Sequence, residues 1–363
     1  KYAYPKNGVL SPCGRYLAWF IGEKGRQVKM AEVSTGRTLL NISAPPGAKF
    51  ERMYSYSFSG NGQYLAVYST NEAVNPILSV YETASGSQVL KTQIGKKNWN
   101  LNSYGLSPDG RFLLAAKQRY IYNKAPESLV VKVDTHSGRI VWEKKISVPE
   151  NGRLQHSGFS QDGKYAVVQG SDGNITLMDS QSGAFIRKLD GESDQISWWG
   201  GSSRLLFNAD DTRLYTPVQS GNFLIKDAQT GQELARVIEL KGQEWITMIP
   251  GGHYASSENG DEYLNVRVGM EISSLGQYYD LFYRPDLVAK QIRQGPVTGS
   301  PGTVPEPDIK LVAQGGLPPS VSFVSPAQNA LQMNRDVTIK VQVRDNGGGI
   351  GKIEWKINGL TIG

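Results

Sequence analysis

The sequence predicts an all-β protein: a β-propeller of six or seven blades, followed by part of a β-sandwich. Gly and Pro together make up 59 of the 363 residues, which is typical of a chain rich in turns. A pattern of a turn followed by a strand recurs five times, at intervals of 48, 48, 53 and 49 residues. Every copy also contains a second turn, 19–28 residues after the first. These observations indicate a repeated unit of four short strands.

The first turn of each copy combines small polar residues, and four of the five copies end in Gly. The copies are 11–14 (SPCG), 59–62 (SGNG), 107–110 (SPDG), 160–163 (SQDG) and 209–212 (ADDT). A run of aromatic and aliphatic residues, typical of a strand, follows each turn. The second turns end at Gly36, Gly86, Gly138, Gly183 and Gly231.

A unit with two turns and four strands describes an antiparallel meander. One such sheet cannot cover both of its apolar faces, so neighbouring sheets are expected to stack radially, as in a propeller. A β-solenoid or a sandwich is the alternative. Solenoid coils are shorter than these units and do not carry two distinct turns, which favours the propeller.

Six aspartates recur in these turns: Asp109, Asp134, Asp162, Asp179, Asp211 and Asp227. In turns, Asp side chains accept hydrogen bonds from the backbone N–H groups that follow them. We therefore predict that these carboxylates stabilise the turns and do not act as general acids or bases.

Cys13 is the single cysteine, which excludes an internal disulfide, a Cys-rich zinc site and a CxxC redox pair. It stands where other copies of the turn have Asp or Asn, so we expect a side chain that faces solvent and has no nucleophilic role. A three-histidine metal site would need all three histidines of the chain to converge. We predict no catalytic residue, no metal site and no cofactor in this chain.

The repeats resemble those of WD-repeat-like propellers. The shared features are the Ser-x-Asp-Gly turn and an Asp-x-x-Ser/Thr-Gly turn, found at 134–138, 179–183 and 227–231. No copy carries the Trp-Asp dipeptide or the Gly-His pair of strict WD repeats, so the resemblance is to the broad superfamily. Segment 133–142 also looks like a blade of quinoprotein dehydrogenases, but its terminal Trp142 occurs in one copy only and no acidic calcium site accompanies it.

The sixth unit departs from the pattern and leads into a helix. It begins with EWITMIPGGHYASS at 244–257. Pro285 suits the first turn of a helix and Gly295 suits its end, which predicts a helix over 286–295. Its apolar residues are expected to dock it on the side or base of the propeller: Leu287, Val288 and Ile292.

A linker and a second domain follow. Residues 296–319 hold six prolines and four glycines. Strand-like patterns resume at 321–324, 337–343 and 353–357. Three or four strands make only part of a sandwich, so we expect this domain to be incomplete or to continue past Gly363. The predicted domains are the propeller at 1–285, the helix at 286–295, the linker at 296–319 and the partial sandwich at 320–363.

Residues 240–363 are similar to part of the bacterial WD-repeat proteins of the caspase-like (metacaspase-related) peptidase group. The similarity lies in the order of motifs: Trp-Ile-x-x-x-Pro-x-Gly-x-Tyr at 245–254, FYRPDLV at 282–288, a Pro-rich linker, then GGGIG at 347–351 and ING at 357–359. It implies that the C-terminal segment is immunoglobulin-like and that a catalytic His/Cys domain follows it in that family. That domain is not in this chain, because no cysteine follows Cys13.

For the chain itself we predict non-catalytic recognition of a protein or peptide by a rigid propeller. The resemblance implies that this is the sensing or regulatory region of a caspase-like cysteine peptidase, with the peptidase domain of the same protein as one partner. Five residues precede or begin the inner strands and are expected to line the mouth of the central channel: Arg52, Trp99, Asn102, Gln155 and His156. Three indoles are candidate anchors for a partner: Trp198, Trp199 and Trp245. For Trp198 and Trp199, packing between blades is the alternative.

Two other function classes stay open at this point. A stand-alone structural or surface interaction protein is the first alternative. A propeller enzyme with its site in the channel is the second, and no convergent set of acid, base and metal ligands supports it.

Charge and hydropathy exclude two kinds of partner. The net charge of +6 is spread along the chain, and no basic run exceeds pairs such as Lys96-Lys97, so no nucleic acid is expected. The longest apolar run, Tyr16–Ile21, is far shorter than the roughly 20 residues of a spanning helix. Because the chain begins at Lys1, an earlier targeting segment is conceivable, and a cytoplasmic and an exported location both stay open.

Overall fold

The structure is a computed structural model with two compact units, Lys1–Ile238 (unit 1) and Glu239–Gly363 (unit 2). It describes residues 6–21, 27–43, 56–70, 76–95, 99–120, 124–149, 152–191, 205–218, 222–268, 271–295, 317–327, 336–347, 349–351, 353, 355–357 and 360–361. Among these residues, none of the helices has the length and apolar character that crossing a membrane requires.

The described residues of unit 1 form five antiparallel sheets. Sheet 1 contains β1 (Lys6–Leu10), β2 (Tyr16–Ile21), β3 (Gln27–Glu32) and β4 (Thr38–Ser43). Sheet 2 contains β5 (Tyr56–Phe58), β6 (Tyr64–Thr70), β7 (Pro76–Glu82) and β8 (Gln88–Gln93). Sheet 3 contains β9 (Asn100–Leu106), β10 (Phe112–Arg119), β11 (Glu127–Asp134) and β12 (Ile140–Lys145). Sheet 4 contains β13 (Leu154–Phe159), β14 (Tyr165–Gly170), β15 (Ile175–Asp179) and β16 (Phe185–Leu189). Sheet 5 contains β17 (Leu206–Phe207), β18 (Arg213–Pro217), β19 (Phe223–Asp227) and β20 (Glu233–Glu239).

The first turn of the repeat is built as the sequence predicts. In sheet 3, Ser107 Oγ accepts a hydrogen bond from Phe112 N (2.9 Å), and Asp109 Oδ1 accepts one from Arg111 N (3.0 Å). The same bond to a serine hydroxyl recurs at Ser11, Ser59 and Ser160. Gly110 ends the turn with a φ of 75°, which glycine adopts without strain.

The turn of sheet 5 is displaced by one residue from its predicted position. Asn208 Oδ1 accepts the bond from Arg213 N (2.8 Å) that a serine accepts in the other sheets. Asp211 therefore occupies the glycine position, and its φ of 59° lies in the left-handed region. The prediction that the copy spans 209–212 was wrong by one position, because Asn replaces Ser and Asp replaces Gly in this copy.

The glycine that ends the second turn faces the preceding sheet. A Cβ atom added to Gly183 would lie 2.7 Å from Trp142 Cδ2 of β12, and one added to Gly231 would lie 2.7 Å from Leu189 Cδ2 of β16. A Cβ atom added to Gly36, the equivalent glycine of sheet 1, would have no atom of the described residues within 4 Å. In sheets 4 and 5, both the positive φ and the close contact therefore require glycine.

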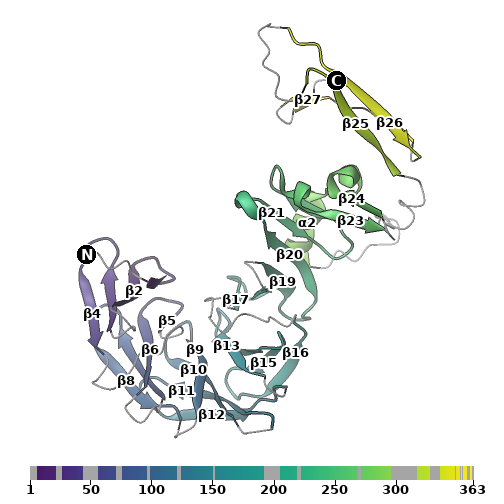
Figure 1. Cartoon of the computed structure of the whole chain (residues 1–363). Helices are drawn as coiled ribbons and strands as arrows, with labels where there is room; N and C mark the ends of the chain where they lie inside the picture. Colours follow the sequence, from purple (N-terminus) through teal and green to yellow (C-terminus); the bar gives the residue numbers. More distant parts are fainter. Residues whose placement is uncertain are drawn as a thin grey trace. The chain divides into compact units, whose positions relative to one another are not determined.

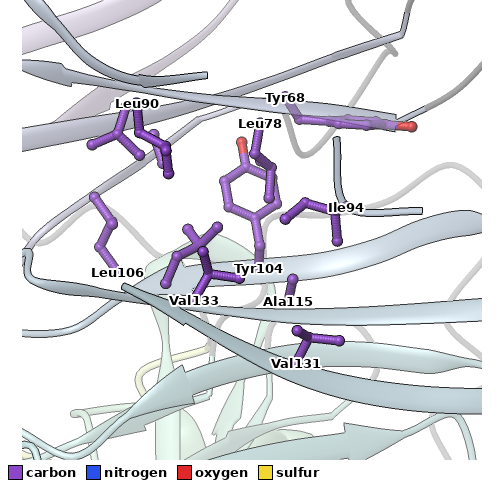
Figure 2. Packing of buried hydrophobic residues seen from close by; sticks show 12 residues of the cluster. Tyr68, Leu78, Leu90, Ile94, Tyr104, Leu106, Ala115, Val131 and Val133 are labelled. Atoms are coloured by element: carbon purple, nitrogen blue, oxygen red, sulfur yellow. The ribbon is translucent and has the colours of Figure 1, made fainter. Parts of the chain in front are cut away.

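The core of unit 1 lies between neighbouring sheets. Apolar clusters fill the spaces between sheets 1 and 2, 2 and 3, 3 and 4, and 4 and 5. Figure 2 shows the second of these, where Leu78 and Leu90 of sheet 2 face Tyr104, Ala115 and Val131 of sheet 3. Burial of apolar surface, at about 25 cal/mol per Å², thus holds each sheet to the next.

A buried lysine adds a polar link between sheets 3 and 4. Lys132 Nζ donates hydrogen bonds to Ser180 O (2.8 Å) and Ser180 Oγ (3.2 Å), and Trp142 Nε1 donates to the same carbonyl (3.0 Å). The ammonium also lies 3.8 Å from the centre of the Phe112 ring, a cation–π contact. Desolvation lowers the pKa of Lys132.

The sheets present their first and fourth strands on opposite sides of unit 1. Figure 1 shows β5, β9, β13 and β17 on the inner side, and β4, β8, β12 and β16 on the outer side. The predicted all-β class is confirmed. The described residues form no closed ring of sheets, so the propeller and its blade number remain a hypothesis.

Unit 2 begins with short elements. These are η2 (Lys241–Gln243), β21 (Trp245–Met248), β22 (Tyr254–Ser256), η3 (Gly260–Tyr263), β23 (Asn265–Val268), β24 (Glu271–Ser274), η4 (Leu275–Tyr278) and α1 (Tyr279–Phe282). β21 pairs with β22, and β23 pairs with β24 in a separate two-stranded sheet. The sixth repeat therefore does not form a four-stranded meander like the first five.

The helix predicted at 286–295 is α2 (Pro285–Gln294). It has Pro285 in its first turn and Gly295 (φ 90°) after its last residue, as predicted. Val288 is buried, Leu287 and Ile292 are half-buried, and the helix packs on β22. Its docking surface is thus the divergent sixth unit.

Two strand pairs end the chain. β25 (Leu317–Ser325) pairs with β26 (Lys340–Asn346), and β27 (Lys356–Ile357) pairs with β28 (Leu360–Thr361). The predicted strands at 321–324 and 337–343 are confirmed, with the second displaced toward the C-terminus, whereas only the end of 353–357 is a strand. Nearly all of the predicted linker lies outside the described residues.

Candidate functional site

Two inner strands, β9 and β13, lie side by side, and four of the predicted binding residues lie in them or directly before them (Figure 1). Ser103 Oγ of β9 donates a hydrogen bond to Ser157 Oγ of β13 (2.9 Å). A Cβ atom added to Gly105 would lie 2.9 Å from Ser157 O, so the close approach of the strands requires glycine there.

A buried glutamine holds the start of these two strands together. Gln118 Oε1 accepts hydrogen bonds from Asn102 Nδ2 (2.5 Å) and Leu154 N (3.0 Å). Its Nε2 donates to Ser128 Oγ (2.8 Å) and Gly152 O (3.4 Å). Because the amide nitrogen of Asn102 is held by Gln118, its oxygen has a fixed direction. That oxygen, Asn102 Oδ1, is buried and accepts no hydrogen bond from the described residues.

Trp99, just before β9, is flanked by two cations of β10. Lys117 Nζ lies 5.2 Å from the centre of the indole, and Arg119 Cζ lies 5.5 Å from it. Lys117 Nζ also pairs with Glu143 Oε2 (2.9 Å), and Arg119 Nη2 with Glu127 Oε2 (2.5 Å). These contacts fix the half-buried indole at the same end of sheet 3 as Asn102.

Gln155 and His156 lie in β13 and are half-buried. The strand is irregular between Leu154 and His156, where its register with β14 shifts. His156 lies opposite Gln169 of β14. The structure thus places the predicted Asn102 in β9 with Trp99 just before it, and Gln155 and His156 in the strand beside it.

Of the other four predicted residues, three are not described by the structure and one belongs to unit 2. Arg52, Trp198 and Trp199 lie outside the described residues. Trp245 belongs to unit 2, where its indole is 43% exposed and its backbone N–H donates to Ser257 Oγ (2.8 Å). Trp245 therefore stays a separate candidate anchor.

Two glutamines at this end of unit 1 were missed by the sequence analysis. Gln118 is fully buried, and Gln169 is nearly so. Gln169 Nε2 donates to Gly173 O (3.2 Å), while its Oε1 finds no partner among the described residues. The sequence feature that could have revealed them is a glutamine at the end of a mostly apolar second strand, as in LLAAKQ at 113–118 and YAVVQ at 165–169.

Five of the six repeated aspartates accept hydrogen bonds from the backbone of their own turn, as predicted: Asp109, Asp134, Asp162, Asp179 and Asp227. These bonds have electrostatic consequences. The hydrogen bond from Ser137 N lowers the pKa of the Asp134 carboxyl, and that from the Ser182 hydroxyl lowers the pKa of Asp179. These carboxylates are committed to turn structure.

For the sixth aspartate, Asp211, the prediction was wrong. Its carboxylate accepts hydrogen bonds from the backbone of a different sheet. Its Oδ1 accepts a hydrogen bond from Gln161 N (2.6 Å) and its Oδ2 from Asp162 N (2.8 Å), both in the first turn of sheet 4. Desolvation raises the pKa of Asp211, and the negative charge of Asp162 adds to the rise. Asp211 therefore links sheet 5 to sheet 4.

Cys13 is exposed in the first turn of sheet 1, as predicted. Its Sγ lies 3.4 Å from Ser11 Oγ, and this hydrogen bond lowers the pKa of the thiol. Elsewhere in the part of the chain that the structure describes, no group of three or more His, Cys, Asp or Glu side chains is arranged to hold a metal ion.

Comparison with known proteins concerns the C-terminus. Residues 319–363 match the family described as a bacterial Ig domain. This match covers most of β25–β28 and agrees with the immunoglobulin-like segment expected there. No curated protein matches the chain. The comparisons therefore add no support for a WD-repeat or caspase-like relationship.

Proposed function

We propose that unit 1 is most of a WD-repeat-like β-propeller and that the chain is a non-catalytic scaffold for recognition of a protein or peptide. Its binding surface would be the inner end of sheets 3 and 4, around Trp99 and Asn102. The observation that carries this proposal is Trp99, a half-buried indole that two cations of β10 flank at the same end of sheet 3 as Asn102.

Trp99 offers a polypeptide a rigid aromatic surface with two cations beside it, and aromatic and Arg side chains are the usual anchors of protein interfaces. Asn102 lies in the strand that follows the indole, where its amide nitrogen donates to Gln118. This bond helps to hold the start of β9 in place, and with it the indole that a side chain of the ligand would contact.

The cellular context is a further part of the proposal. The order of motifs in residues 240–363 resembles that of bacterial caspase-like proteins, and the match of 319–363 to a bacterial Ig domain agrees with the last part of that order. On this basis the scaffold would regulate a caspase-like cysteine peptidase domain of the same protein. Addition of the scaffold to that domain in trans, with peptidase activity as the readout, tests this part separately.

A random-peptide display library, selected on the whole chain, tests the recognition surface. Selected peptides should lose about tenfold or more in affinity on Asn102→Ala or Trp99→Ala, since each loss is worth about 1.4 kcal/mol or more. Phe323→Ala, an exposed aromatic of β25 outside both unit 1 surfaces, is the matched control and should change affinity less than twofold. If no selected peptide depends on Trp99 or Asn102 while both variants melt like the wild type, the surface is assigned wrongly.

A further inference from the structure

The fourth strand of every sheet in unit 1 has a bulge at the same place. The register shifts once between the third and fourth strands of all five sheets. In each sheet the extra residue lies three positions after the glycine of the second turn and is aliphatic: Leu39, Val89, Val141, Ile186 and Leu234. The same structural position thus carries the same chemistry five times.

In sheets 2, 3 and 4 these aliphatic residues are exposed. We call β8, β12 and β16 the outer rim, since they lie on the outer side of unit 1 (Figure 1). The apolar residues at the start of these strands are 37–66% exposed: Val89, Ile140, Val141, Phe185 and Ile186. Leu234, at the equivalent position of sheet 5, is fully buried. The outer rim therefore presents an apolar row that sheet 5 does not.

A basic row accompanies the apolar one. The rest of the three strands carries five exposed basic residues: Lys91, Lys144, Lys145, Arg187 and Lys188. The one acidic residue of the outer rim, Glu143, is paired with Lys117 (2.9 Å). Arg187 Nη1 donates to Gln229 O, and the four lysines form no ion pair with the described residues. With five basic residues and one acidic residue, the outer rim has a net charge of +4. The net charge of the whole chain is +6.

Protection of a sheet edge explains part of this pattern. Bulges and lysines on edge strands prevent a second chain from pairing with the backbone. That role does not require an aliphatic bulge residue, and a polar one would cost less in water. The outer rim combines an exposed apolar row with basic side chains that form no ion pair with the described residues. This combination is typical of a surface that binds an amphipathic, negatively charged partner.

We propose that the outer rim binds an acidic amphipathic segment of a partner protein, which lies across β8, β12 and β16. Its apolar residues would cover Val89, Val141 and Ile186, and its carboxylates would face the lysines. This surface is separate from the inner one around Trp99 and goes beyond the function proposed above.

A polypeptide fits the outer rim better than an anionic lipid bilayer. The second turns next to the apolar row carry exposed serines, Ser85, Ser137 and Ser182, whose hydroxyls donate to the carboxylates of Glu82, Asp134 and Asp179. A bilayer that covers the apolar row would bring these carboxylates close to its own anionic headgroups, and like charges repel. A segment that lies across the strands covers the row and leaves the turns in water.

Selection from the same kind of display library, with counter-selection on the double variant Lys144→Glu/Lys188→Glu, tests this proposal. Peptides that bind the wild type and not the variant should be net negative and contain apolar residues. A labelled peptide from this set should bind the variant at least tenfold more weakly, and Val141→Ser/Ile186→Ser should weaken it as well. Lys290→Glu, an exposed lysine of α2, is the matched charge control and should change affinity less than twofold.

Three results would overturn the proposal: no peptide that depends on the outer rim, dependent peptides that are neutral or basic, or a Val141→Ser/Ile186→Ser variant that binds like the wild type. Sedimentation with phosphatidylserine vesicles is the second arm. Binding there that depends on Lys144 and Lys188, without any acidic peptide, would assign the outer rim to a membrane. Trp99→Ala should leave this binding unchanged, so a failure here is distinct from a failure at the inner surface.

Discussion

Sheet 4 has a neighbour on each side, and the two contacts are made differently. Toward sheet 3, the apolar cluster is closed by buried polar groups: Lys132 and Trp142 bond to Ser180, and Gln118 bonds to Leu154. Toward sheet 5, the apolar cluster is accompanied by a part-buried link, from Lys226 Nζ to Asp190 O (2.6 Å), and by Asp211 at the surface. The same repeat thus makes one contact with several fully buried polar links and one whose polar links are part-buried or exposed.

The difference teaches what polar links contribute to a stack of similar sheets. Apolar clusters hold any two sheets together, but they specify position weakly, whereas hydrogen bonds such as Lys132–Ser180 are satisfied at one register only. Buried links also limit how far the surroundings can relax when a side chain is removed. The contact between sheets 3 and 4 should therefore be the stiffer of the two.

The largest expected effect comes from truncation of a core leucine in each contact. Leu114 lies between sheets 3 and 4 and Leu214 between sheets 4 and 5, and both are fully buried. Leu→Ala substitutions of this kind cost about 2–5 kcal/mol, and more where the cavity cannot collapse. We expect Leu114→Ala to fall in the upper half of that range and Leu214→Ala in the lower half, measured by urea unfolding. Equal losses would show that the buried polar links do not stiffen the contact.

A smaller effect is expected at the glycine that faces sheet 3. Gly183→Ala combines a residue at positive φ with a Cβ atom 2.7 Å from Trp142. Backbone strain of about 1 kcal/mol and overpacking of about 1–3 kcal/mol add at this site. Gly36→Ala has the same φ of 68° and no described atom within 4 Å, so it should cost only the strain. If the two variants unfold at the same temperature, the contact with Trp142 is not tight.

The smallest expected effect is at Asp211, in the contact between sheets 4 and 5. Here the free energy of unfolding should depend on pH. Asp211→Asn leaves one acceptor for two backbone N–H groups and should cost about 0.5–1.5 kcal/mol. Because the pKa of Asp211 is raised on folding, its stabilising contribution is complete below its unfolded pKa of about 3.9 and falls as the pH rises through its folded pKa. The difference between wild type and variant should therefore shrink from pH 3.5 to pH 7 in urea titrations. Growth of that difference with pH would mean that folding favours the carboxylate.

Asp162, in the sheet 4 turn to which Asp211 bonds, has the opposite pH dependence. Desolvation opposes the shift, but hydrogen bonds from Lys164 and Ser160 lower the pKa of Asp162 to about 2. Its contribution is present above the unfolded pKa of about 3.9 and is lost as the pH falls toward 2. Asp162→Asn is therefore the matched control: its cost should increase with pH over the range in which that of Asp211→Asn decreases.

The sequence predicts most of the local structure of unit 1, because each repeat carries its own turn chemistry. Ser107 and Asp109 lie two residues apart and bond within one turn, so a short pattern contains all that the turn needs. The helix α2 was predictable for the same reason, from Pro285 and Gly295. The fifth turn was misaligned by one residue because Asn208 and Asp211 replace the usual Ser and Gly.

Features that combine several sheets could not be predicted in this way. Asn102, Gln118 and Leu154 come from different strands, and their hydrogen bonds depend on how sheet 4 stacks on sheet 3. The basic row of the outer rim was hidden because Lys91, Lys144 and Lys188 are far apart in the sequence and look like scattered charges. Their common position on the outer side follows from the repeat itself, which returns the chain to the same side of unit 1 in every sheet (Figure 1).

The contact between Gly183 and Trp142 gives the succession of sheets a polarity. In sheets 3, 4 and 5 the glycine of the second turn faces a bulky side chain of the sheet before it, and in sheet 2 it faces the Leu39 carbonyl, so the two surfaces that meet are unlike. Contacts of this head-to-tail kind are heterologous: they close into a ring when the rotation per unit allows it and otherwise propagate. Among the described residues, the series of such contacts begins with Gly86 of sheet 2 against Leu39 of sheet 1.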